Sequence, residues 1–229
     1  MIANNPLVDD AVTFTVEDGL RVSARLELPP AARACYVLAH GAGAGMRHVF
    51  LETLSEELAS RGVATLRYQF LYVEQGRTRP DPPALLEATV RAAVAEAERL
   101  APHLPRIAGG KSMGGRMTSL AASHAPLPGV RGLAFLGFPL HPAGAPGDSR
   151  AQHLADVPLP MLFLQGTRDT LADLGLITAV CRRLGARATL EIVEGADHGF
   201  HVLRRSGRTN AQVLGALADS LVRWSEGLP

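Results

Sequence analysis

The sequence predicts an α/β protein in which helices cover both faces of a mostly parallel, eight-stranded sheet. From residue 34 onward, short apolar runs alternate with longer segments whose apolar residues recur every three or four positions, as strands and helices do in parallel sheets. Before them, two segments of alternating apolar and polar residues flank Asp18-Gly19, a dipeptide that favours a hairpin. The sheet should therefore begin with an antiparallel pair.

The elements of the first half follow from these patterns. Strands are expected at residues 11–17, 20–28, 34–39, 63–68 and 105–108, and helices at residues 50–58 and 86–97. Residues 34–39 are apolar throughout, as in a strand that is buried on both faces. In the second helix Leu86, Val90 and Ala93 share one face, which should pack against the sheet.

The second half continues the alternation. Strands are expected at residues 130–138, 161–164 and 189–193, and helices at residues 117–121, near Gln152, at 174–184 and at 214–224. Between the strands that end at residue 138 and begin at residue 161 there are only about twenty residues, near the upper end for a plain connection. We therefore expect no cap domain.

Length and composition favour one domain, residues 1–229, that acts on a small molecule. The chain can bury a substantial core. Its formal net charge of +1, with 20% charged residues, offers neither the basic excess typical of nucleic-acid binding nor the acidic excess of disorder. Residues 1–10 lack a secretion signal, and no apolar stretch reaches membrane-spanning length. We expect a cytoplasmic protein without nucleic-acid or membrane partners, and no feature indicates its oligomeric state.

The segment Gly110-Lys111-Ser112-Met113-Gly114 contains the pattern GxSxG, in which a serine is held on a sharp turn between a strand and a helix. Glycines flank the serine where the chain and the helix crowd together. The same residues resemble the end of a phosphate-binding loop, but that pattern needs a glycine where this chain has Pro105. A nucleophilic serine is the stronger hypothesis.

A serine hydroxyl needs an imidazole to take its proton, and the imidazole needs a carboxylate to orient it. Asp169 and His198 follow two predicted strands, and the carboxyl ends of parallel strands meet at one edge of a sheet. Ser112, Asp169 and His198 are therefore the expected catalytic residues. Rival acids are Asp197, Asp148 and Asp156, of which the last two follow the sixth strand and the first is adjacent to the histidine.

The chain resembles the α/β-hydrolase superfamily in its order of serine, acid and histidine along the sequence. The resemblance covers essentially the whole chain. The motifs around His40, Ser112, Asp169 and His198 are most similar to small lidless hydrolases related to dienelactone hydrolase. Within these they resemble a little-characterised group, whose relatives include a hydrolase-like domain in a subunit of an animal chromatin-acetylating complex. Dienelactone hydrolase itself has a cysteine nucleophile, so its substrate cannot be carried over to Ser112.

This resemblance implies a nucleophilic Ser112, a general base His198 and an orienting Asp169. It also implies an oxyanion hole formed by the backbone N–H groups of Met113 and Ala42. The resulting expectation is a serine hydrolase that cleaves a small carboxylic ester or thioester without a metal or other cofactor. The alternative is a binding or scaffold protein that has kept the fold and lost turnover.

Three basic residues are expected to flank the site and to favour small anionic esters, namely Lys111, Arg67 and Arg116. Lys111 is the only lysine among 23 basic residues, so it could serve a role that arginine cannot. His40 should hold the glycine-rich loop that follows it by hydrogen bonds. Cys35 and Cys181 lie in apolar segments without metal-ligand spacing, which favours buried, reduced thiols.

Overall fold

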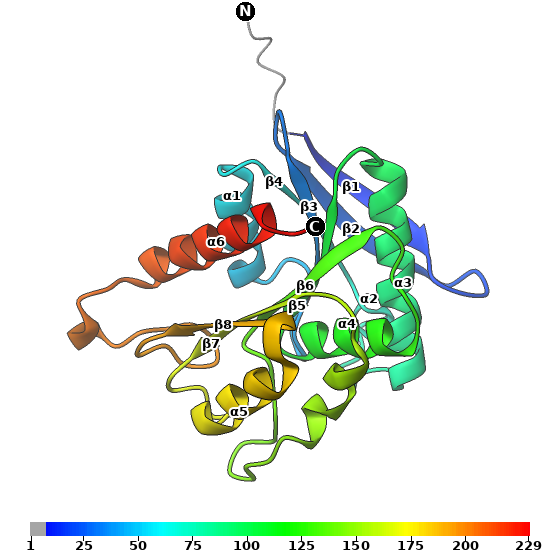
Figure 1. The fold of residues 1–229 in the computed structure, drawn as a ribbon. Helices are drawn as coiled ribbons and strands as arrows, with labels where there is room; N and C mark the ends of the chain where they lie inside the picture. The colour runs from blue at the N-terminus through cyan, green and yellow to red at the C-terminus, as the bar shows by residue number, and fades with distance from the viewer. Residues whose placement is uncertain (1–7) are drawn as a thin grey trace, which may run out of the picture.

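A single sheet of eight strands forms the centre of the computed structural model, which describes residues 8–229 (Figure 1). The strands are β1 (Val8–Thr15), β2 (Arg21–Leu28), β3 (Ala34–Ala39), β4 (Val63–Tyr68), β5 (Arg106–Lys111), β6 (Val130–Leu136), β7 (Met161–Gly166) and β8 (Ala188–Val193). Their spatial order is β1-β2-β4-β3-β5-β6-β7-β8. The β1–β2 and β2–β4 pairs are antiparallel, and the other neighbours are parallel. The expected fold class is confirmed.

Helices cover both faces of this sheet, because each presents one apolar stripe to it. The α-helices are α1 (Val49–Ala59), α2 (Leu71–Glu74), α3 (Pro83–Leu100), α4 (Met113–His124), α5 (Leu174–Leu184) and α6 (Asn210–Glu226). Helices α1 and α6 lie side by side on one face, and their buried residues join one apolar cluster. Helices α3, α4 and α5 contribute to a second cluster on the other face.

The predicted end of the fifth strand is wrong, because this strand contains two glycines. The sequence predicts that the fifth strand ends at Ala108, but β5 continues through Gly109 and Gly110 to Lys111. Both glycines have positive φ values, of 151° and 149°. A Cβ atom at Gly109 would lie 1.9 Å from the carbonyl oxygen of Ala134, so no larger residue fits between these neighbouring strands.

The connection from β6 to β7 contains one short 3₁₀ helix, η1 (Ser149–Asp156), and no cap domain, as expected. Two more 3₁₀ turns, η2 (Gly185–Arg187) and η3 (Arg204–Ser206), and the four-residue α2 were not predicted. Both Cys35 and Cys181 are buried free thiols. Among residues 8–229, no helix is both long enough and apolar enough to cross a membrane.

Candidate active site

Ser112 lies at the turn between β5 and α4, as the motif predicted. Its backbone has φ 51° and ψ −117°, a conformation that costs a non-glycine residue free energy. Two close approaches hold the turn in place. A Cβ atom at Gly110 would lie 2.2 Å from the oxygen of Ala39, and one at Gly114 would lie 2.5 Å from the oxygen of His40. Glycine is therefore needed on both sides of the serine.

Three side chains that lie far apart in the sequence form one chain of hydrogen bonds. Nε2 of His198 lies 2.9 Å from Oγ of Ser112, and Nδ1 of His198 lies 2.7 Å from Oδ2 of Asp169. In the neutral imidazole that fits these contacts, Nδ1–H donates to the carboxylate and Nε2 accepts the serine hydroxyl. Asp169 follows β7, His198 follows β8 and Ser112 follows β5, so all three lie at the carboxyl edge of the sheet.

The carboxylate of Asp169 is buried and has further partners. Nε2 of Gln165 donates to Oδ2 at 2.6 Å, and the backbone N–H of Leu171 donates to Oδ1 at 2.8 Å. Burial by itself raises the pKa of Asp169. The hydrogen bond and charge of His198, the amide of Leu171 and the charge of Lys111 outweigh that effect, so the net pKa lies below the usual value. The carboxylate thus stays ionised beside the imidazole.

In the part of the chain that the structure describes, no hydrogen bond or ion pair joins the side chain of a rival acid to the imidazole of His198. The Oδ1 atom of Asp197 accepts the backbone N–H groups of Gly199 and His201 at 2.8 and 2.9 Å, which is a loop-capping role. Asp148 forms an ion pair with Arg183 at 2.5 Å. Asp156 is exposed at the end of η1.

The glycine-rich loop after β3 lines the cavity beside Ser112. A Cβ atom added to Gly41 would lie 3.6 Å from the Cβ of Ser112, and Ala42 lines the same cavity. Met113 is the first residue of α4, where backbone N–H groups have no partner within the helix. These positions suit the two expected N–H donors, Ala42 and Met113.

His40 holds this loop, as expected. Its Nδ1 lies 2.8 Å from the carbonyl oxygen of Gly41, and its Nε2 accepts the N–H of Phe70 at 3.1 Å. The ring is fully buried. Burial lowers the pKa of His40 to about 4, so the ring stays neutral and keeps one donor and one acceptor.

Among the described residues, those that line the cavity do not include Arg67 or Arg116, so binding of substrate by either arginine stays a prediction. Arg67 is 4% exposed, its Nη1 donates to the carbonyl of Met46 at 3.0 Å, and its guanidinium lies 3.6 Å from both Glu27 and Glu52. The sequence alone does not distinguish a strand arginine that is buried in an ion pair from one that faces a binding site. Here it anchors the end of the glycine-rich loop.

Arg116 lies on α4 and is half-buried. Burial and the charge of Arg150, a residue of η1, lower its pKa. Its charge also contributes to lowering the pKa of His153 in η1, after the larger effect of burial. Arg116 therefore lies beside η1 and outside the cavity lining. Of the three basic residues, the cavity includes only Lys111.

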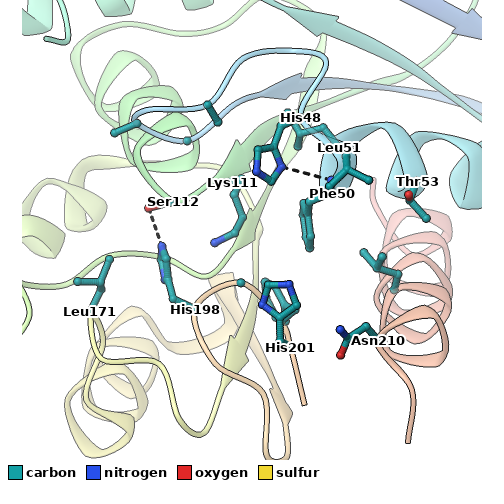
Figure 2. A pocket seen from close by; sticks show the side chains of 17 residues that line it. His48, Phe50, Leu51, Thr53, Lys111, Ser112, Leu171, His198, His201 and Asn210 are labelled. Atoms are coloured by element: carbon teal, nitrogen blue, oxygen red, sulfur yellow. Dashed lines mark hydrogen bonds between the residues drawn. The ribbon is translucent and has the colours of Figure 1, made fainter. Parts of the chain in front are cut away.

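A cavity of about 610 Å³ opens beside Ser112 and His198 (Figure 2). It runs from Leu171 and Ser112 past Phe50 to Thr53 and Asn210, so the beginnings of α1 and α6 form its far end. Most of its wall is apolar, as in small-molecule sites. The sequence alone does not predict that Phe50, Thr53, Leu171 or Asn210 lines the cavity. Phe200 also lines it, and its place two residues after His198 is the one indication that the sequence offers.

Gln165 is a second residue that sequence reasoning missed. It is the penultimate residue of β7, four residues before Asp169, and it also accepts the backbone N–H of Phe138 at 3.0 Å. Its side chain is fully buried, which is unusual for glutamine, but no motif in the sequence identifies it. Within residues 8–229, no group of three histidine, cysteine, aspartate or glutamate side chains could hold a metal ion.

Residues 32–226 match the family described as alpha/beta hydrolase domain. Among solved structures, a dienelactone hydrolase from Anabaena variabilis is 22% identical, with a TM-score of 0.77, over 97% of this chain and 98% of that one. A serine hydrolase without a lid from Xanthomonas campestris is 22% identical, with a TM-score of 0.74, over 98% and 99%. Est1E from Butyrivibrio proteoclasticus is 16% identical, with a TM-score of 0.73, over 93% and 97%. At these identities the likeness to the solved structures is one of fold.

Proposed function

This chain belongs to the alpha/beta hydrolase domain family, and we propose that it is a serine hydrolase that cleaves a small carboxylic ester or thioester through an acyl-enzyme. The observation that carries the proposal is the continuous hydrogen-bond chain Asp169–His198–Ser112. It ends on a serine held at a strained turn beside the cavity. Strain of this kind is typical of functional residues.

In the first half of the proposed reaction, Oγ of Ser112 attacks the carbonyl carbon of the ester. Nε2 of His198 takes the hydroxyl proton, and Asp169 stabilises the imidazolium that forms. The N–H groups of Met113 and Ala42 would stabilise the negative charge on the carbonyl oxygen, and the N-terminus of α4 adds a favourable dipole. His198 then gives its proton to the departing alcohol or thiol, leaving an ester of Ser112.

In the second half, water takes the place of the alcohol. His198 removes a proton from the water as its oxygen attacks the acyl carbon, and it returns that proton to Oγ when the acid leaves. The products are the free acid and the regenerated serine. No cofactor is needed for any of these steps. The buried thiols Cys35 and Cys181 are compatible with the cytoplasmic location that we propose.

Related structures support ester chemistry without defining the substrate. Est1E from Butyrivibrio proteoclasticus has been solved with ferulic acid bound. We propose a small acyl group for the present chain, because no domain inserted between β6 and β7 covers the cavity. In keeping with an uncovered cavity, the side chain of Val49 at its wall is 70% exposed.

Steady-state hydrolysis of p-nitrophenyl acetate tests the proposal. Ser112→Ala and His198→Ala should each lower the rate by roughly 10⁴-fold or more, as loss of a triad residue does. Ser123→Ala is the matched control, because this serine lies on α4 and, among residues 8–229, its hydroxyl bonds only the carbonyl of Leu120 in its own helix. An Ser112→Ala protein that keeps more than a tenth of the activity would rule out this nucleophile. No turnover of any ester by the wild-type protein would favour a binding protein.

A further inference from the structure

The amine of Lys111, the neighbour of Ser112, is buried next to the candidate triad. Its Nζ has no hydrogen-bond partner among the described residues. It lies 6.0 Å from the ring centre of Phe50 and 5.5 Å from that of Phe200, contacts that offset part of the cost of burying a charge. Figure 2 shows the side chain between Ser112 and Phe50, with its amine directed towards His198.

Gly137 shows how close the amine lies to the acid and the histidine. A Cβ atom placed on this glycine would lie 3.2 Å from Nζ of Lys111, 3.4 Å from Oδ2 of Asp169 and 3.4 Å from Nδ1 of His198. The amine of Lys111, the carboxylate of Asp169 and the imidazole of His198 therefore all lie close to Gly137. One carboxylate faces two groups that can each carry a positive charge.

The charge of Lys111 depends on its surroundings. Burial lowers its pKa to about 8, although the charges of Asp169 and Asp197 act in the opposite direction. The other titratable groups on the cavity wall are His198, His48 and His201. The amine can thus change charge near neutral pH, which an arginine at this position could not do.

We propose that Lys111 is a positioning residue of the triad, whose charge sets how readily His198 takes the proton of Ser112. The proposal rests on the proposed function. While Lys111 is charged, it shares the carboxylate of Asp169 and disfavours a second cation on His198. When Lys111 loses its proton, the imidazolium has the carboxylate to itself, so the acyl-transfer step becomes faster.

Direct binding of a substrate anion, the role expected from the sequence, fits the geometry less well. Nζ is buried, and its neighbours include Phe50, Phe200 and Gly137. An anion could reach the amine only if these groups moved. The two roles differ in their consequences, because anion binding would change KM for charged esters and leave the acid limb of the pH–rate profile unaltered.

Titration of Lys111 itself tests the coupling without turnover. Because the sequence has a single lysine, protein labelled with ¹³C-lysine gives one side-chain signal to follow by NMR. We expect Asp169→Asn to lower the midpoint by about one pH unit, since a nearby negative charge is lost. Asp219→Asn, an exposed change on α6 beside Arg61, is the matched control and should leave it unchanged. Equal midpoints in wild type and Asp169→Asn would overturn the proposal.

The pH profile of kcat/KM for p-nitrophenyl acetate provides the second test. The wild type should show a second rise near pH 8. Lys111→Met should lose that rise and move the acid limb upward by about one pH unit, because the cation that opposes His198 protonation is gone. Lys111→Arg should keep the wild-type acid limb and lack the rise.

Profiles that coincide in all three active proteins, namely the wild type, Lys111→Met and Lys111→Arg, would refute the role of Lys111 and leave the proposed hydrolase function intact. An inactive wild type would instead refute the proposed function, while the lysine titration would still test the coupling.

Discussion

The carboxylate of Asp169 lies 2.7 Å from Nδ1 of His198, although 29 residues separate them in the chain. Asp197 is adjacent to the histidine, yet its carboxylate turns back to the amides of Gly199 and His201. Asp197 accepts hydrogen bonds within its own loop, whereas Asp169, which follows the neighbouring strand β7, reaches Nδ1 of His198. The two aspartates therefore have separate roles.

Replacing these two acids should rank them. Asp169→Asn should lower kcat/KM for p-nitrophenyl acetate by roughly 10³- to 10⁴-fold, because the amide cannot stabilise the imidazolium or hold the required tautomer. Asp197→Asn should cost less than about tenfold, since it disturbs only loop hydrogen bonds. Steady-state kinetics on both purified variants checks this order. The reverse order would assign the orienting acid to Asp197.

Arg67→Met should lower the free energy of unfolding by about 3–5 kcal/mol, because it leaves Glu27 buried without its cation. Urea unfolding measures this loss. Arg67→Met combined with Glu27→Gln should recover part of it, since no unpaired charge then remains. If Arg67→Met unfolded like the wild type and raised only KM for anionic esters, Arg67 would be a substrate-binding residue after all.

The protein should lose stability as the pH falls from 6.5 towards 4, in part through His40. The pKa of His40 is about 4 in the folded state, against 6.5 for an unperturbed histidine, so the unfolded chain binds more protons in this window. The contribution of His40 is complete above pH 6.5 and should fall by about 2 kcal/mol at pH 5.

Urea unfolding at pH 7 and pH 5 would isolate this contribution if His40→Gln is compared with the wild type. The variant should be less stable at pH 7 but lose less stability on acidification, because glutamine does not titrate. His153 provides a check, since burial also lowers its pKa to about 4, so His153→Gln should reduce the loss independently. Equal pH dependence in the wild type and His40→Gln would contradict a neutral, buried His40.

Short esters should be better substrates than long ones. Because the cavity has no cap and borders the exposed side chain of Val49, methylene groups beyond the first few should remain in water and add little binding. We expect kcat/KM for p-nitrophenyl butyrate to exceed that for the palmitate ester by roughly tenfold or more, a threshold we set from this burial argument. Efficient palmitate hydrolysis that increases above the micellar concentration would contradict a lidless site.

The sequence predicts most of the fold because the central strands are buried on both faces. β3 and β4 coincide with the predicted ranges, since every residue in each is buried. Local patterns fail where tertiary packing overrides them. The glycines that extend β5 would ordinarily weaken a strand, and only the neighbouring backbones show why they are needed. That residues 1–229 form one domain stays a prediction.

The candidate site is predictable where a role needs a particular residue type. Ser112 and His198 are identified by motif and strand order, but the position of Asp169 among several acids depends on the topology. The ion pair of Arg67 could not be predicted, because its partner Glu27 lies on β2 and only the antiparallel register of β2 and β4 brings the two strands together. Gln165 has no motif at all, so the sequence could not relate it to the acid.

Covalent labelling of the folded protein with a fluorophosphonate tests the central claim most directly. The probe reacts with a serine only when a base and an oxyanion site activate it. Intact-protein mass spectrometry should show one added phosphonyl group, mapped to Ser112 by peptide analysis, and labelling should be lost in Ser112→Ala and retained in Ser123→Ala. A folded wild-type protein that remains unlabelled, or that is labelled at another serine, would contradict the assignment of Ser112 as the activated nucleophile.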